Sequence, residues 1–121
     1  MKNISAFYSD EYFRQRSIET IEQFSGYLRQ VCKKNNQIPV LPNHSPDALY
    51  RKYQDLLEEN MDLATFTEEL IKDSNHLHHP RYMGHQCAAP NPLASISAMM
   101  GGLLNNGSAV YEMGPVNVAM E

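Results

Sequence analysis

The chain has 121 residues, which is enough for one domain with a modest hydrophobic core. Its 14 acidic and 10 basic residues give a formal net charge of -4 and a pI near 5.7, which argues against nucleic-acid or anionic-membrane binding, because either partner favours a basic face. No segment approaches the ~20 apolar residues of a membrane span, and the first ten residues lack the apolar core of a signal peptide. Cys32 and Cys87 have no partners at metal-ligand spacing, so we expect free thiols in a reducing cytoplasm.

The charged residues are concentrated in the first 73 positions. From Ser74 to Glu121 the formal charges are only Arg81, Glu112 and Glu121, while this stretch also holds five of the seven methionines. An apolar segment of this kind usually faces another subunit or a larger domain. The composition therefore predicts a helical arm followed by an interface or core segment.

The first predicted helix runs from Ser9 to about Lys34. Ser9 is a suitable N-cap, and the acidic residues after it suit the positive end of the helix dipole. Apolar residues recur at spacings of three and four and form one stripe, which we expect to point at a partner: Ile21, Phe24, Leu28 and Val31. Asn35-Asn36 should stop this helix, and the two prolines of residues 38–42 predict an extended linker.

Two further helices are predicted by their capping residues. Ser45-Pro46-Asp47 combines a capping serine, a proline at the first helical position and an acid. The expected buried side of this second helix is Leu49, Tyr53, Leu56 and Leu57. Asp62 should cap a third helix, whose expected inner face is Phe66, Leu70 and Leu77.

The last third of the chain predicts two more helical segments. Asn91-Pro92 repeats the cap-then-proline signal and opens a helix that continues through Leu104. Gly101-Gly102 weakens it by ~1 kcal/mol per glycine, so we expect a close neighbour that requires small residues. Gly114-Pro115 interrupts the helical pattern, and residues 116–121 begin another helix. This last helix lacks a C-terminal signal, so we expect the chain to be an all-α fragment of a longer protein.

Candidate sites built from these residues alone are weak. A metal site could use His76, His79 and His85, but Pro80 disfavours helix at His79, and packing or hydrogen bonding by loop histidines is the favoured interpretation. Cys87 as a nucleophile with His85 as its base is disfavoured, because residues two apart point to opposite faces of an extended segment. We therefore expect Cys87 to be a small buried thiol. The carboxylate pairs Glu58-Glu59 and Glu68-Glu69 are expected on solvated helix surfaces.

Four motifs in the second half, taken in order, resemble the group II pyridoxal-phosphate-dependent amino-acid decarboxylases. These motifs are His79-Pro80-Arg81-Tyr82-Met83-Gly84-His85, Pro90-Asn91-Pro92-Leu93-Ala94, Leu103-Leu104-Asn105-Asn106 and Tyr111-Glu112-Met113-Gly114-Pro115. The family includes the aromatic-amino-acid, histidine, glutamate and 2,4-diaminobutyrate decarboxylases. The resemblance covers residues 60–121 well and the first helices only in layout.

The resemblance implies a homodimeric fold-type-I enzyme of the α/β class, with active sites at the subunit interface. Residues 1–78 would be an N-terminal helical dimerisation arm, and residues 79–121 a substrate-pocket loop and helix that lead into a large domain absent from this chain. The implied activity is that of a carboxy-lyase that removes the α-carboxylate of an amino acid as CO2. The implied partners are a second copy or the remainder of the decarboxylase, and the expected location is the cytoplasm.

Residue by residue, the resemblance implies substrate contacts at seven positions: His85, Gln86, Cys87, Ala88, Gly107, Ala109 and Tyr111. Because Gly107 and Ala109 are small where aromatic-type members carry bulky residues, a polar or aliphatic substrate is favoured. No catalytic, cofactor-binding or metal residue is identified, since none of the five lysines lies in the His-Lys context of the family. We therefore expect the chain alone to bind no pyridoxal phosphate and to be inactive; the alternative is an independent helical interaction module without catalysis.

Overall fold

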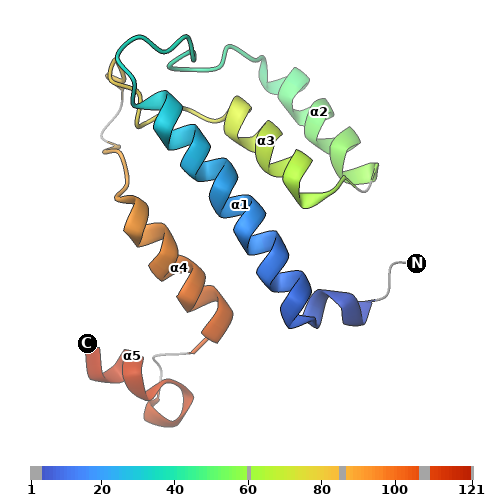
Figure 1. The fold of residues 1–121 in the computed structure, drawn as a ribbon, viewed down its shortest axis with the longest axis vertical. Coiled ribbons are helices and arrows are strands. Elements are labelled where there is room, and N and C mark those ends of the chain that lie inside the picture. Colours follow the sequence, from blue (N-terminus) through green and yellow to red (C-terminus); the bar gives the residue numbers. More distant parts are fainter. Residues whose placement is uncertain (1–3, 60, 85–86, 107–109, 121) are drawn as a thin grey trace. The chain divides into compact units, whose positions relative to one another are not determined.

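The computed structural model describes residues 4–59, 61–84, 87–106 and 110–120. These residues form helices and no strand, which confirms the all-α prediction for the chain itself (Figure 1). The elements in order are η1 (Ile4–Tyr8), α1 (Asp10–Val31), α2 (Pro46–Glu58), α3 (Leu63–Asp73), α4 (Pro92–Leu104), η2 (Tyr111–Met113) and α5 (Pro115–Met120). The chain separates into two compact units, Met1–Cys87 and Ala88–Glu121. The functional boundary expected after His78 and the α/β fold of a full-length enzyme stay predictions.

Local capping explains where the first three α-helices begin. The Ser9 hydroxyl accepts a hydrogen bond from the Tyr12 amide at 3.3 Å, and the Ser45 hydroxyl accepts one from the Ala48 amide at 3.2 Å. The Asp62 carboxylate accepts hydrogen bonds from the two amides at the start of α3, Ala64 and Thr65, at 3.0 and 3.1 Å. Each cap satisfies amides that have no partner inside the helix. The three N-termini predicted from sequence are thus confirmed.

The end of α1 shows how Asn36 stops the helix. Its side-chain amide donates to the carbonyl oxygens of Val31 and Lys33, at 2.8 and 2.6 Å, and so satisfies the Val31 carbonyl in the last turn of α1 and ties it to the turn that follows. The helix therefore ends at Val31, three residues before the expected Lys34.

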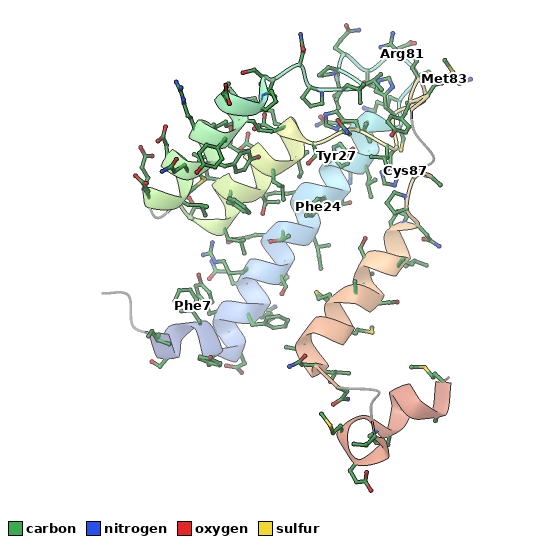
Figure 2. The ribbon with its side chains drawn as sticks, turned by 180° about the vertical axis from the view of Figure 1, so that it is seen from behind. Phe7, Phe24, Tyr27, Arg81, Met83 and Cys87 are labelled. Atoms are coloured by element: carbon green, nitrogen blue, oxygen red, sulfur yellow. The ribbon has the colours of Figure 1, made fainter. Side chains whose placement is uncertain are left out.

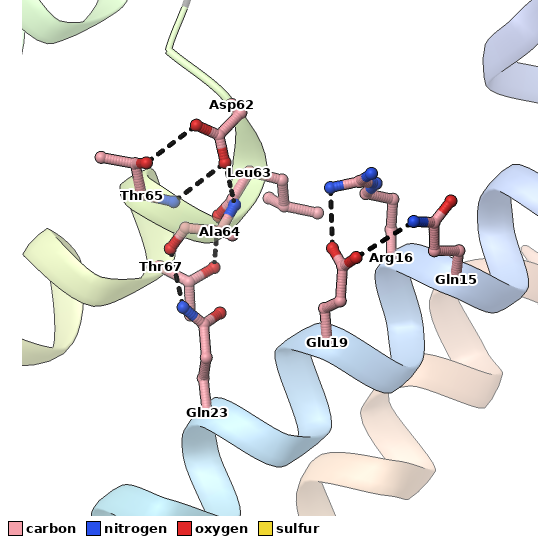
Figure 3. A network of polar contacts seen from close by, with 9 residues as sticks. All are labelled: Gln15, Arg16, Glu19, Gln23, Asp62, Leu63, Ala64, Thr65 and Thr67. Atoms are coloured by element: carbon pink, nitrogen blue, oxygen red, sulfur yellow. Dashed lines mark hydrogen bonds and ion pairs between the residues drawn. The ribbon is translucent and has the colours of Figure 1, made fainter.

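Unit 1, Met1–Cys87, contains α1 packed against α3, and a hydrogen bond joins these two helices. Gln23 on α1 donates to the Ala64 carbonyl oxygen on α3 at 2.8 Å (Figure 3). Arg16 and Glu19, on the same helix, form an ion pair at 2.7 Å next to this contact. Polar contacts of this kind orient two helices but contribute little net free energy, about 1 kcal/mol per hydrogen bond.

The hydrophobic core of unit 1 is small. Among the described residues, Val31 is the one fully buried hydrophobic side chain. The rest of its predicted stripe is less covered, with Ile21 51% and Phe24 41% exposed (Figure 2). On α2 the expected burial of Leu57 is wrong, because its side chain is 70% exposed, and Leu77 lies in the turns after α3 instead of on that helix. The apolar side chains of these helices thus remain largely outside any core that the described residues form.

Unit 2, Ala88–Glu121, contains the predicted fourth helix. The Asn91 side chain accepts from the Leu93 amide at 3.0 Å and begins α4, as expected, and Asn105 ends it in the left-handed conformation with φ 47°. The large apolar side chains of α4 are all exposed: Leu93, Ile96, Met99, Met100, Leu103 and Leu104. The close neighbour expected at Gly101-Gly102 is not found, because a Cβ atom built on either glycine meets no described atom within 4 Å.

None of the helices in the described ranges combines the length and apolar character needed to cross a membrane. The longest, α1, carries charged residues along its whole length. The apolar helix α4 has 13 residues, fewer than the ~20 that span a bilayer.

Replacing Ser45 by alanine should remove the cap of α2. We expect the free energy of unfolding to fall by about 1 kcal/mol, because the Ala48 amide loses its acceptor. Urea titration followed by far-UV circular dichroism measures the change. Ser25→Ala is the matched control, because Ser25 is an exposed position inside α1, where alanine is the better helix former. Equal losses in both variants would contradict the capping role.

Candidate functional site

The seven positions implied by the resemblance are mostly not visible as a site. Four of them lie outside the described residues: His85, Gln86, Gly107 and Ala109. Cys87 and Ala88 are both exposed and fall on either side of the division between the two units, and Tyr111 begins η2. Cys87 is therefore not the buried thiol expected from sequence, because no described residue covers it. The substrate contacts stay predictions.

Unit 1 contains a cleft of about 820 Å³. It is lined by α1, by the linker between α1 and α2, and by α3 with the residues that follow it; Tyr27, Pro39 and Ile71 represent these three walls. Its volume lies in the range of small-molecule sites. The walls combine apolar surface with a few polar side chains, among which His44 and His76 are the titratable imidazoles.

A buried histidine closes one wall of this cleft. His76 is 2% exposed, and its Nδ1 lies 3.1 Å from the Tyr27 hydroxyl on α1 (Figure 2 labels Tyr27). The His76 amide donates to the Val40 carbonyl oxygen at 3.1 Å, which joins the segment to the linker. Burial lowers the pKa of His76, and the neighbouring His79 lowers it further. Burial likewise raises the pKa of Tyr27, so both groups are neutral near pH 7.

His79 is the second buried histidine, with 3% of its surface exposed. Its Nδ1 accepts a hydrogen bond from the Arg81 amide at 3.0 Å, so the neutral ring carries its proton on Nε2. That Nε2 atom is buried without a hydrogen-bond partner among the described atoms. The interpretation of loop histidines as packing and hydrogen-bonding groups is confirmed for His76 and His79.

A cluster of charged groups lies beside the cleft and centres on Asp73. The Asp73 side chain is 3% exposed and receives Lys52 of α2, with Nζ 2.6 Å from Oδ2. His44 approaches the other oxygen, with Nε2 3.0 Å from Oδ1, although this contact lacks the geometry of a hydrogen bond. Lys52 also binds Glu69. Tyr53 lies near Asp73 and also lowers the pKa of its carboxyl group. The cluster joins α2, α3 and the linker.

The pKa values in this cluster favour the charged forms. Burial alone would raise the pKa of Asp73, but the hydrogen bond and the positive charge of Lys52 outweigh burial and hold that pKa below its ordinary value. The hydrogen bond from Lys52 likewise lowers the pKa of Glu69. Burial would lower the pKa of Lys52, but its hydrogen bonds to Asp73 and Glu69 raise it. Near neutral pH the cluster is therefore one ammonium group between two carboxylates.

These residues do not fit pyridoxal phosphate. A lysine that forms a Schiff base must reach its neutral amine, which a desolvated site with few anions favours. Lys52 is held as a cation by two carboxylates, and Lys72 is exposed and lies 3.6 Å from Glu69. The other described lysines, Lys33 and Lys34, are exposed after the end of α1. In the described ranges no group of three His, Cys, Asp or Glu side chains is placed to hold a metal ion.

Sequence reasoning missed the Asp73 cluster. Glu69 was expected on a solvated helix face, but its side chain is only 23% exposed and is paired with Lys52. A partial signal existed, because Glu69 and Asp73 are four residues apart and share one face of α3. Their cation lies 17 and 21 residues earlier in the chain, a separation that no helical periodicity encodes.

Comparison with known proteins adds no relative to this picture. No family model matches the chain, and no curated protein or solved structure matches it either. The candidate site is therefore interpreted from its own geometry.

Replacing Lys52 by methionine should leave Asp73 buried without its cation. We expect a loss of about 2 kcal/mol in the free energy of unfolding, between the values typical of exposed pairs and of broken buried pairs. Lys72→Met is the matched control; its side chain is 66% exposed, so a loss below about 0.5 kcal/mol is expected. Urea titrations of both variants at neutral pH provide the measurement. A Lys52→Met variant as stable as the parent would show that the cluster does not hold α2 on α3.

Proposed function

We propose that this chain is the N-terminal dimerisation arm and part of the substrate pocket of a pyridoxal-phosphate-dependent amino-acid decarboxylase, acting in the cytoplasm. The observation that carries the proposal is the mismatch between apolar side chains and core. Val31 is the one buried hydrophobic residue among those described, whereas apolar side chains of α1 and α4 are exposed. A chain with so much uncovered apolar surface is stabilised by a partner that covers it.

The apolar stripe of α1 supports an arm that packs on another subunit. Ile18, Ile21 and Phe24 are 47%, 51% and 41% exposed, while the side of α1 that contacts α3 presents Gln23 to the Ala64 carbonyl. Within unit 1, much of the apolar stripe of α1 therefore has no cover among the described residues. Complete burial of each such side chain contributes about 1.5–3 kcal/mol.

The charges of α1 support a second copy of the same chain as the partner that covers its apolar stripe. Its first turn carries Asp10 and Glu11, and its last turn carries Arg29, followed by Lys33 and Lys34. If two α1 helices paired in antiparallel orientation, the acidic end of each would lie beside the basic end of the other. The opposed helix dipoles would favour the same arrangement.

Helix α4 supports the second part of the proposal, a segment that enters a larger domain. It carries no charged residue, and its large apolar side chains are exposed around the helix, including Leu93, Met100 and Leu104. A helix that is apolar on all sides is typical of the interior of a larger protein. In this proposal the pocket residues on either side of α4 contact a polar or aliphatic amino acid, and the cofactor is held by residues outside the chain.

The coding sequence tests the proposal directly. We expect the reading frame to continue beyond the Glu121 codon and to encode a His-Lys pair in a pyridoxal-phosphate context. The enzyme purified from that frame should release CO2 from an amino acid and lose this activity when the lysine is replaced by alanine. A stop codon directly after Glu121 would contradict the decarboxylase proposal and favour a helical interaction module without catalysis.

The arm is tested by charges placed in the α1 stripe. We expect Ile21→Glu combined with Phe24→Glu to convert a dimer into a monomer, because two carboxylates cannot be buried in the interface without partners. Size-exclusion chromatography with light scattering measures the molar mass. Gln30→Glu is the control, because position 30 lies on the opposite side of the helix from position 21. A double variant that remains dimeric would place the interface elsewhere.

A further inference from the structure

The residues after α3 form two successive turns that lie against α1 and the linker. We call residues 74–82 the histidine turn. Its backbone hydrogen bonds run from the His79 amide to the His76 carbonyl and from the Tyr82 amide to the His79 carbonyl, each 2.9 Å long. Two contacts hold it in place: the His76 amide on the Val40 carbonyl, and the His76 ring on the Tyr27 hydroxyl. The two buried imidazoles, His76 and His79, are thus the parts of the turn that enter the interior of unit 1.

The environment of His76 disfavours a second proton on its ring. His76 is 2% exposed, and an imidazolium at this position loses the hydration that it has in water. The polar atom next to its Nδ1 is the Tyr27 hydroxyl, which carries no negative charge that could stabilise the cation. The neighbouring His79 holds the shape of the turn, because its Nδ1 accepts the Arg81 amide at 3.0 Å.

We infer that the histidine turn is an acid-operated latch: protonation of the buried His76 releases residues 74–82 from α1 and the linker. The segment precedes Cys87, the last residue of unit 1. The latch lies entirely in unit 1. It does not depend on whether the chain serves a decarboxylase.

Other charged groups line the cleft beside His76, and some of them would stabilise an imidazolium there while others would destabilise it. Glu22 on α1 and Glu68 on α3 would favour an imidazolium, but both side chains are exposed and act through water. Lys72 on α3 opposes a second cation, and His44 on the linker adds one if it is protonated. Tyr27, the direct partner of His76, is neutral near pH 7 because burial raises its pKa. Burial therefore dominates the balance at His76.

The direction of the pH response follows from the lowered pKa of His76. The docked turn keeps His76 neutral, while the released turn binds a proton as soon as the pH falls below the ordinary value of 6.5. Docking is therefore unaffected above that pH. It weakens by up to about tenfold per pH unit between the ordinary and the lowered pKa.

Amide hydrogen exchange on the full 121-residue chain tests the latch. From about pH 7.5 to 5.5, after correction for intrinsic exchange, the His76, His79 and Tyr82 amides should lose protection by a factor of up to about ten. Amides in the middle of α1 should not change by more than about twofold. Unchanged protection of the histidine turn over this range would overturn the inference.

Two variants identify the group that titrates. His76→Gln keeps a polar side chain but cannot be protonated in this range, so the loss of protection between about pH 7.5 and 5.5 should disappear to within about twofold. Arg81→Gln is the matched control on the same turn, because this exposed side chain does not titrate in the range, and it should keep the parental response. A parental response in the His76→Gln variant would overturn the role of His76. If the His76→Gln variant does not fold, the imidazole signals of His76 in the parent chain are followed as the pH falls. Titration of His76 near 6.5 while the turn stays protected would also overturn the latch.

Discussion

The burial of the Asp73 carboxylate constrains how unit 1 is built. A carboxylate whose side chain is 3% exposed is tolerated only with a cation beside it, and Lys52 of α2 supplies that cation. Lys52 therefore holds α2 on α3, where Tyr53 also packs edge-to-face on Phe66. These contacts act beside a small hydrophobic core, in which Val31 is the fully buried hydrophobic side chain among the described residues. Polar pairs such as Lys52 with Asp73 fix orientation well but add little net stability, because each group must first lose its water.

The distribution of apolar surface is consistent with this small core. Helix α1 donates a hydrogen bond from Gln23 to α3, while much of its apolar stripe remains exposed. Helix α4, described by itself, exposes its apolar side chains as well. The proposal of a dimerisation arm follows from this combination, because a partner would contribute the hydrophobic burial that the chain alone does not provide. The resemblance to the decarboxylases adds a chemical context but does not alter the physical argument.

Helix starts were predictable because their signals are local. Ser9, Ser45, Asp62 and Asn91 each lie within three residues of the amides that they cap, and the structure confirms all four. Tertiary features were less accessible. Periodicity placed Leu57 on a buried side of α2, and the low helix propensity of Gly101-Gly102 suggested a close neighbour of α4. Neither signal carries information on whether a covering element exists.

The candidate site shows the same contrast between local features, which the sequence predicts, and tertiary contacts, which it does not. The sequence favoured packed and hydrogen-bonded histidines in the loop after α3, and His76 and His79 are of this kind. Their partners were not predictable, since Tyr27 precedes His76 by 49 residues. Most of the pocket positions implied by the resemblance lie outside the described residues or on exposed segments, so they remain predictions.

The left-handed residue at the end of α4 limits which sequences can preserve this helix boundary. Asn105 has φ 47°, a conformation that costs most L-residues about 1–2 kcal/mol and that glycine, asparagine and aspartate adopt most readily. A β-branched residue at this position would favour other backbone angles and would direct the chain differently towards η2. Few residue types are therefore tolerated at position 105, although the side chain itself is exposed. Among natural variants of this chain, position 105 should accept few substitutions for a reason that belongs to the backbone alone.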